Sequence, residues 1–137
     1  MKYMLDTNIC IYLIKKRPQK VLKKFESLKI GDICISSVTL AELMYGIKKS
    51  QHCEKNQLAL EHFSVPLDIQ PFDDESARCY GHIRAVLEKK GMPIGALDLM
   101  IAAHAQSINA ILVTNNVKEF SRVPDLIIEN WVEGAEE

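Results

Sequence analysis

The chain has 137 residues, of which 47% are apolar and 26% are charged, and its formal net charge is −1. This length suits one domain with a buried core, and this composition excludes an intrinsically disordered chain. The balanced charge gives no overall attraction to nucleic acid, so RNA binding would need a local basic patch. No apolar run approaches the roughly 20 residues that span a bilayer, and no signal segment precedes the first apolar run. We therefore expect a cytoplasmic protein with no membrane partner.

Short apolar runs alternate with longer amphipathic stretches along the chain. The runs predict strands at residues 3–5, 33–35, 67–69 and 110–113, with 126–128 as a possible fifth strand. Apolar residues at helical spacing predict helices at 9–14, 21–28, 40–47 and 77–87, and the nearly all-apolar stretch 97–108 predicts a buried helix. Strands separated by helices need crossover connections, so the pattern predicts an α/β fold with a parallel sheet covered on both faces. We expect one domain over residues 1–132 and a frayed acidic tail at 133–137.

Oxygen-bearing side chains follow several of the predicted strands. In parallel sheets of this kind, ligands bind outside the carboxyl ends of the strands. Four places along the chain should meet there: Asp6 with Thr7 and Asn8, then Glu42, then Asp98, and finally Thr114, Asn115 and Asn116 with Glu119 beyond them. Carboxylates brought together in a cleft repel one another, so the arrangement favours a bound cation. Because no His or Cys belongs to the set, the sequence predicts a hard ion, Mg²⁺ or Mn²⁺.

Each of these positions also has a purely structural interpretation. Asn8 or Thr7 could cap the helix that follows the first strand. Thr39 and Glu42 have the spacing of a capping box, in which the glutamate reaches back to the start of its helix. Asp98 could stabilise the beginning of the buried helix, and the polar residues after the fourth strand could form a turn.

Four segments of the chain resemble the PIN-domain nucleases, and specifically the VapC toxins of bacterial toxin–antitoxin pairs. The segments are MLDTNICIYLI at 4–14, ISSVTLAELMYGIKKS at 35–50, PIGALDLMIAAHA at 93–105 and LVTNNVKEFSRVPDL at 112–126. Their order and spacing match the family from one end of the chain to the other, whereas residues 51–90 fall where the family varies.

The resemblance implies a three-layer α/β/α sandwich with a small parallel sheet of four to five strands. It also implies Mg²⁺-dependent endoribonuclease activity, with Asp6, Glu42 and Asp98 as the acidic core that holds the metal. Many family members carry a fourth acidic residue where this chain has Asn116. Either Asn116 or the nearby Glu119 would then fill the fourth catalytic position.

Further expectations follow from the same resemblance. Asn8, Thr7 and Thr114 match polar residues that orient the carboxylates and water in the family. The enteric-type VapC toxins, which the chain resembles most, suggest cleavage of initiator tRNA in its anticodon loop. Such toxins commonly form homodimers and pair with a VapB antitoxin, whose C-terminal segment fills the active-site groove and through which the pair contacts DNA.

Basic and aromatic residues beside the predicted cleft are candidates for holding RNA. The basic candidates are Lys15, Lys16, Arg17, Lys48, Lys49 and Arg84. Their spacing predicts that Lys16 shares a helix face with the lysines at 20, 23 and 24. Tyr12 and Tyr45 could stack on bases, although tyrosines on a helix face more often pack in a core or an interface. His104 is expected to be a packed, hydrogen-bonded histidine, because sites for hard ions rarely use imidazole.

Two other functions remain open from the sequence. A Mg²⁺-dependent phosphatase could use Asp6 as its nucleophile, but such enzymes usually carry a second aspartate where this chain has Asn8. A PIN-like module that binds RNA or a protein partner without cleaving RNA could follow from the loss of an acidic residue at Asn116.

Overall fold

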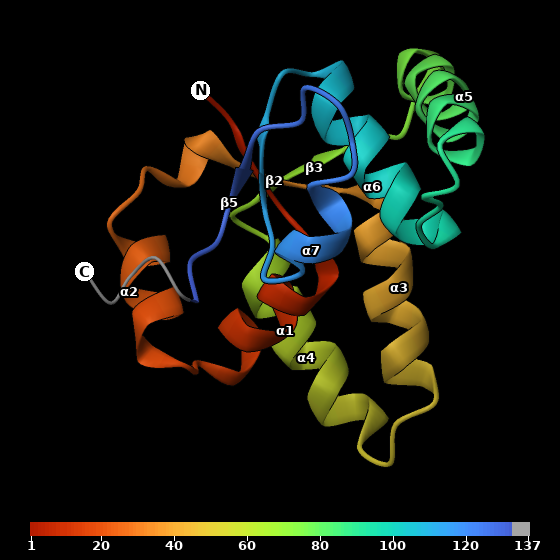
Figure 1. Ribbon diagram of the computed structural model, residues 1–137. Helices are drawn as coiled ribbons and strands as arrows, with labels where there is room; N and C mark the ends of the chain where they lie inside the picture. Colours follow the sequence, from red (N-terminus) through yellow and green to blue (C-terminus); the bar gives the residue numbers. More distant parts are fainter. Residues whose placement is uncertain (133–137) are drawn as a thin grey trace.

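Five parallel strands form a small sheet at the centre of the structure, a computed structural model that describes residues 1–132 (Figure 1). Their bounds are β1 Tyr3–Leu5, β2 Ile33–Ser36, β3 Asp68–Gln70, β4 Ile111–Val113 and β5 Ile128–Glu129. The spatial order is β3-β2-β1-β4-β5, and every neighbouring pair runs parallel. The predicted parallel sheet is confirmed, although the fifth strand begins at Ile128 and not at Leu126.

The central strands are buried on both faces because successive side chains point in opposite directions. Met4 of β1 pairs with Leu112 of β4, and both belong to the core on one face. The next residues along, Leu5 and Val113, also pair with each other and belong to the core on the opposite face. Two separate cores therefore sandwich the sheet, as the uninterrupted apolar runs predict.

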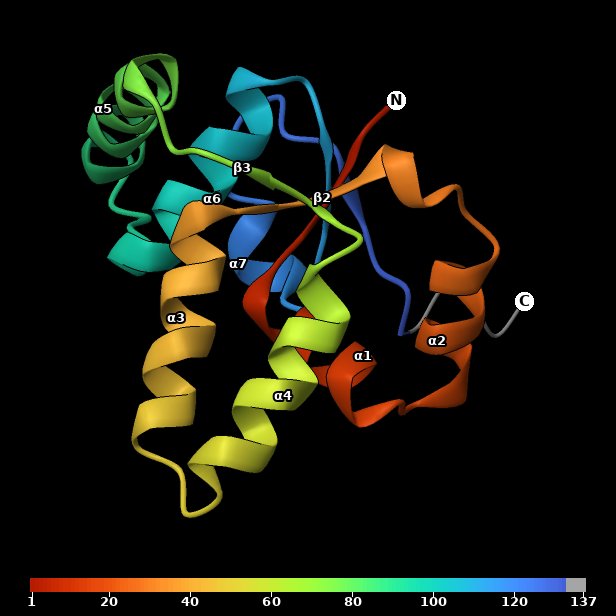
Figure 2. The same cartoon turned by 180° about the vertical axis from the view of Figure 1, so that it is seen from behind.

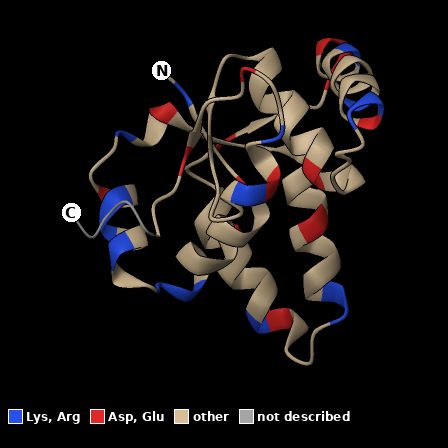
Figure 3. Ribbon diagram, in the orientation of Figure 1, with Lys and Arg blue, Asp and Glu red and all other residues tan. Residues whose placement is uncertain are grey.

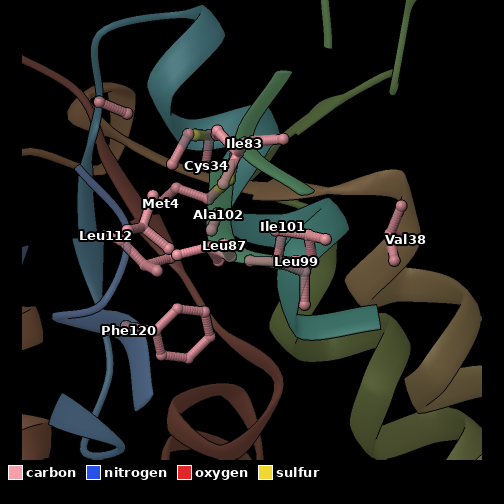
Figure 4. Close-up of a cluster of buried hydrophobic side chains, with 14 residues drawn as sticks. Met4, Cys34, Val38, Ile83, Leu87, Leu99, Ile101, Ala102, Leu112 and Phe120 are labelled. Atoms are coloured by element: carbon pink, nitrogen blue, oxygen red, sulfur yellow. The ribbon is translucent and has the colours of Figure 1, made fainter. Parts of the chain in front are cut away.

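Helices cover both faces and complete three layers. They are α1 Thr7–Lys15, α2 Gln19–Glu26, α3 Ser37–Lys48, α4 Cys53–Ser64, α5 Asp74–Lys89, α6 Ala96–Ser107 and α7 Val117–Phe120, with a short 3-10 helix at Ile30–Asp32. The Met4 face packs against α5 and α6, and Figure 4 shows Leu87 and Ala102 of these helices close to Met4 and Leu112. The opposite face packs against α1, α2 and α4.

The sequence did not predict α4, because residues 53–57 contain no apolar side chain besides Cys53 and so show no helical periodicity. Leu60 is the buried residue of this helix. Figures 1 and 2 show α3 and α4 as a helical hairpin that extends beyond the sheet on the side where β1 runs into α1. The carboxyl ends of the strands therefore open toward α1, α3 and the start of α6. No helix within residues 1–132 combines the length and apolar character that crossing a membrane requires. The predicted acidic tail at 133–137 lies outside the described residues.

Candidate active site

Asp6 is fixed at the point where β1 becomes α1. Its backbone N–H donates to the carbonyl of Val113 at 3.0 Å, which extends the pairing of β1 with β4 by one residue. Its carboxylate caps α1 by accepting a hydrogen bond from the backbone N–H of Ile9 at 2.9 Å. The expectation that Asn8 or Thr7 caps this helix is wrong, because the chain turns into the helix directly after the strand and leaves Asp6 at the N-cap.

The Asp6 carboxylate is only 4% exposed, and this burial raises its pKa above the ordinary value. The charge of Glu42 raises the pKa further, whereas hydrogen bonds from the Thr114 side chain and the Ile9 backbone lower it. Asp6 thus has a rigid position and a destabilised negative charge. This enclosed setting suits an orienting ligand better than the exposed nucleophile that a phosphatase needs.

Glu42 projects from the second turn of α3 and is held there by Thr7. The Thr7 hydroxyl donates to Glu42 Oε1 at 2.5 Å, joining the first residue of α1 to α3. The alternative of a capping box with Thr39 is wrong, because α3 begins at Ser37 and Ser36 is its N-cap, accepting from the backbone N–H of Val38 at 3.1 Å. Glu42 therefore lies too far into the helix to reach its beginning.

Asp98 is the third residue of α6, and its side chain does not cap that helix, whose N-cap is Gly95. Its pKa is raised to about 6, first by burial, then by a hydrogen bond with Glu119 and by the negative charges of Glu119, Asp6 and Glu42. The charges of the other three carboxylates thus all act on Asp98. The four side chains come from the residue before α1 and from α3, α6 and α7.

The arrangement of the carboxylates is visible in the ribbon coloured by charge. Figure 3 shows the acidic segments of α3, α6 and α7 on the side of the sheet where α1 begins. Within residues 1–132, however, no three acidic, His or Cys side chains converge tightly enough to form a finished metal cage. The donors have the chemistry that a hard cation prefers, since they are oxygens, partly buried and mutually repulsive. The charge and the atom type of these carboxylates fit a divalent ion. Their side chains would have to move closer together to coordinate it.

The two candidates for the fourth position differ in where they lie. Glu119 contacts Asp98, as described above. Asn116 instead uses its backbone N–H to donate to Thr114 Oγ1 at 2.9 Å, and it precedes α7 without a side-chain capping bond. Thr114 in turn bonds Asp6, so Asn116 supports the site through the loop. The geometry favours Glu119 as the fourth carboxylate.

The remaining supporting candidate, Asn8, is exposed in the first turn of α1. Its backbone contributes to the Asp6 site by lowering the Asp6 pKa through a hydrogen bond. Thr7 was predicted only as a general polar helper or a cap. Its specific pairing with Glu42 joins residues 35 positions apart and carries no local signal in the sequence.

The basic candidates lie in three separate places. Lys15, Lys16 and Arg17 are exposed at the end of α1. The predicted helix face shared by Lys16 with the lysines of α2 is wrong, because α1 ends at Lys15 and the chain turns before α2. Figure 3 shows a basic segment at this turn and another along α2.

Of the other basic candidates, Lys49 and Arg84 are already engaged with neighbouring side chains. Lys49, just beyond the end of α3, places Nζ 5.0 Å from the centre of the Tyr45 ring, and Lys48 is exposed beside it. Arg84 on α5 donates from Nε to Glu88 at 2.8 Å and from Nη1 to the Tyr80 hydroxyl at 2.9 Å. Within residues 1–132, Lys48 and the three cations at the end of α1 are therefore the basic candidates without a side-chain partner.

The comparison with known proteins decides the family. The PIN domain profile matches residues 3–126 of the chain. The chain belongs to the PIN-domain family. Ribonuclease VapC2 of Rickettsia felis is similar to it, with 52% identity over 132 residues that cover 96% of this chain and 98% of the relative. The tRNA(fMet)-specific endonuclease VapC of Shigella flexneri is 49% identical over 131 residues, which cover 96% of this chain and 98% of the relative.

Solved structures agree with this assignment. A crystal structure of VapBC2 from Rickettsia felis bound to a DNA fragment from its promoter contains a chain similar to this PIN domain, with a TM-score of 0.90 and 50% identity. The match covers 96% of this chain and 99% of that chain. The PIN domain is thus of the VapC type, and both the predicted fold and the resemblance to VapC are confirmed.

Proposed function

We propose that this protein is a metal-dependent endoribonuclease and the toxin of a VapBC-type toxin–antitoxin pair. The observation that carries the proposal is the meeting of Asp6, Glu42, Asp98 and Glu119 outside the carboxyl ends of the strands. The names of the relatives support the same reaction, because the similar proteins of Rickettsia felis and Shigella flexneri are called a ribonuclease and an endonuclease.

The proposed cofactor is Mg²⁺, with Mn²⁺ as an alternative. Asp6, Asp98 and Glu42 would hold it through carboxylate oxygens, with Glu119 completing the set. When bound, such an ion lowers the pKa of a coordinated water and neutralises charge that develops on the phosphate. Burial is the largest cause of the raised pKa values of Asp6 and Asp98, and repulsion from neighbouring carboxylates adds to it. These values support the proposal, since a bound cation would stabilise the charged form of both groups.

The side chains have distinct tasks in the proposed hydrolysis. Asp6 is fixed by the Ile9 backbone and Thr114, and so gives the site a rigid reference point. Glu42, held by the Thr7 hydroxyl, would orient the attacking water and accept its proton. Water would attack phosphorus in line as the bond to the 3′ oxygen breaks, and the leaving oxygen would take up a proton. The products would be a 3′-hydroxyl and a 5′-phosphate.

The proposed substrate is initiator tRNA, cut in its anticodon loop. The name of the Shigella flexneri relative supports this choice, because that protein is called specific for tRNA(fMet). An unpaired loop also suits a cleft with nearby cations, since its bases and backbone are both accessible. We further propose a VapB-type antitoxin as protein partner, in keeping with the VapBC2 complex of Rickettsia felis, which is bound to promoter DNA. We also propose that the protein forms a homodimer and contacts DNA only through the antitoxin.

The test is cleavage of total bacterial RNA by the protein freed of antitoxin. New 5′ ends would be mapped with Mg²⁺ or with EDTA, for the wild type and for Asp98→Asn. Discrete cuts that need the metal and disappear in the variant are expected, and a cut confined to the anticodon loop of initiator tRNA would identify the substrate. Metal binding without any cut would instead favour a non-catalytic module, and cuts that persist in EDTA would overturn the metal-dependent mechanism.

A further inference from the structure

A hollow beside the end of α1 plays no part in the carboxylate site. Ile11, Tyr12, Lys15, Arg17 and Pro18 line it, and its volume is about 410 Å³. Small-molecule sites commonly measure roughly 300–1,000 Å³, so the hollow is large enough for one planar group. One wall is a half-buried aromatic ring, and the rim carries two cations.

The local backbone forms this hollow by reversing direction after α1. Lys16 takes up a left-handed conformation with φ 60°, and its N–H donates to the carbonyl of Leu13 at 3.1 Å. The next N–H, from Arg17, donates to the carbonyl of Tyr12 at 3.0 Å. This pair of bonds is a Schellman motif, which ends the helix and brings Arg17 and Pro18 back beside the Tyr12 ring.

The Tyr12 ring is held in place by the loop that follows β4. Asn115 Nδ2 donates to the Tyr12 hydroxyl at 2.9 Å, across 103 positions of sequence. Asn115 follows Thr114, whose side chain bonds Asp6. The same short loop therefore positions both the carboxylate site and the aromatic wall of the hollow.

The charged side chains that line the hollow are both cations and could bind a phosphate. Neither Lys15 nor Arg17 forms an ion pair with any residue of the described chain 1–132, and both are exposed. An aromatic ring beside free cations is the usual arrangement for a single-stranded nucleotide, because the base stacks on the ring and the phosphate meets the cations. Single-strand recognition in RNA relies on the same contacts.

The hollow is also connected to the proposed catalytic residues. A neighbouring groove between α1, α3 and α4 shares Ile11 and Lys15 with it and reaches Glu42. Tyr12 follows Asp6 by six residues, which is about 9 Å along a helix axis. A nucleotide in the hollow would therefore lie near the phosphate at the carboxylates.

We propose that this hollow is a nucleotide subsite, in which one unpaired base flanking the cleaved bond stacks on Tyr12 while its phosphate lies between Lys15 and Arg17. The proposal rests on the proposed ribonuclease function and deepens it. It makes Tyr12 a substrate-binding residue and Asn115 the residue that positions it.

Binding measurements with defined RNAs test the subsite. The nuclease-dead Asp98→Asn protein would be titrated with the anticodon stem-loop of initiator tRNA, and with versions that lack one loop base at a time. We expect Tyr12→Leu to weaken binding about tenfold, the size of one lost base stack. We also expect one of the abasic RNAs to bind the Tyr12 protein about as weakly as the intact RNA binds Tyr12→Leu. Combining that abasic RNA with Tyr12→Leu should then cause no further loss of affinity. Lys89→Ala, at the exposed end of α5, is the control for a charge away from the hollow.

Second variants keep the result interpretable if Tyr12→Leu does not fold. Tyr12→Phe retains the ring and should bind nearly as the wild type does, whereas Arg17→Ala should weaken charged RNA more than RNA with one neutral phosphate linkage. Affinity unchanged by Tyr12→Leu, or by Arg17→Ala where Tyr12→Leu does not fold, would overturn the subsite. Weakened binding of a protein partner alone would also overturn it and assign the hollow to that partner. Base-dependent binding without cleavage by the wild type would sustain the subsite and contradict the nuclease.

Discussion

His104 Nδ1 and Ser36 Oγ lie 2.7 Å apart, and this contact joins α6, which carries Asp98, to the start of α3, which carries Glu42. Ser36 Oγ also accepts the backbone N–H of Val38, so its own proton is free to be donated to His104. The imidazole is 1% exposed and meets the Phe72 ring edge-on at 5.6 Å. The prediction of a packed, hydrogen-bonded histidine is confirmed, and its partner links the two helices that carry Asp98 and Glu42.

Replacing His104 with Phe should lower the free energy of unfolding by about 1–3 kcal/mol, because Ser36 would lose a buried hydrogen-bond partner. Urea denaturation with and without the change measures this loss. Ser36→Ala should cost about 1 kcal/mol through the lost cap of α3, and the double variant should be less destabilised than the sum of the two. Fully additive losses would argue against a direct interaction between the two side chains.

Asp98→Asn should stabilise the metal-free protein near pH 7 by on the order of 1 kcal/mol, because it removes a carboxylate whose charge is disfavoured by burial and by its acidic neighbours. The gain is small because water partly screens these interactions. The pKa of Asp98 is about 6 in the folded chain, above its ordinary value of 3.8. Its protonation therefore favours the folded state, and that contribution is fully present below about pH 4 and lost as the pH rises through 6. Thermal unfolding from pH 4 to 8 would check this. A difference in melting temperature between variant and wild type that stays the same at every pH would contradict it.

Thr7→Val should leave the fold intact and lower the cleavage rate about 10- to 100-fold, since residues that hold a ligating carboxylate commonly have effects of this size. The reason is the hydroxyl of Thr7, which holds Glu42 Oε1. Thr7→Ser is the matched control because it keeps the hydroxyl. Rates under metal saturation measure the effect, and equal activity of the Val and Ser variants would show that the bond has no catalytic role.

Glu119→Gln and Asn116→Ala separate the two candidates for the fourth position. We expect Glu119→Gln to lower the pKa of Asp98, because it removes a neighbouring negative charge, and to weaken metal binding. Asn116→Ala should change metal affinity little, since its contact with Thr114 uses the backbone N–H. Calorimetric titration with Mn²⁺ and carboxyl NMR across the pH range would distinguish them. A larger loss of metal affinity in the Asn116 variant would reverse the assignment.

Lys16→Gly should raise the free energy of unfolding by about 1 kcal/mol. Lys16 has φ 60°, a conformation that costs an ordinary L-residue roughly 1–2 kcal/mol and glycine almost nothing. Part of the gain is offset by the greater freedom of glycine in the unfolded chain. Chemical denaturation measures the difference, with Ala85→Gly at an exposed position inside α5 as a control that should destabilise. Destabilisation by Lys16→Gly would mean that contacts of the lysine side chain stabilise the fold by more than the backbone strain at this position costs.

The sequence by itself predicted the order of the five strands along the chain, the parallel sheet and all helices except α4 and α7. It also predicted that Asp6, Glu42 and Asp98 would meet outside the carboxyl ends of the strands. Strand and helix periodicities are local properties, and residues that follow parallel strands must emerge at one edge. The tertiary structure alone decided between competing local patterns. Asp6 and not Asn8 caps α1, and Ser36 and not Thr39 begins α3.

The same limit applies to the pairs that complete the site. Thr7 meets Glu42, His104 meets Ser36, and Asn115 meets Tyr12, across 35, 68 and 103 positions respectively. Each pair depends on how far one helix or loop lies from another after packing, and that distance is set by the sizes of many core side chains together. Local sequence patterns contain no information on such distances, which is why these contacts emerge only in the folded chain.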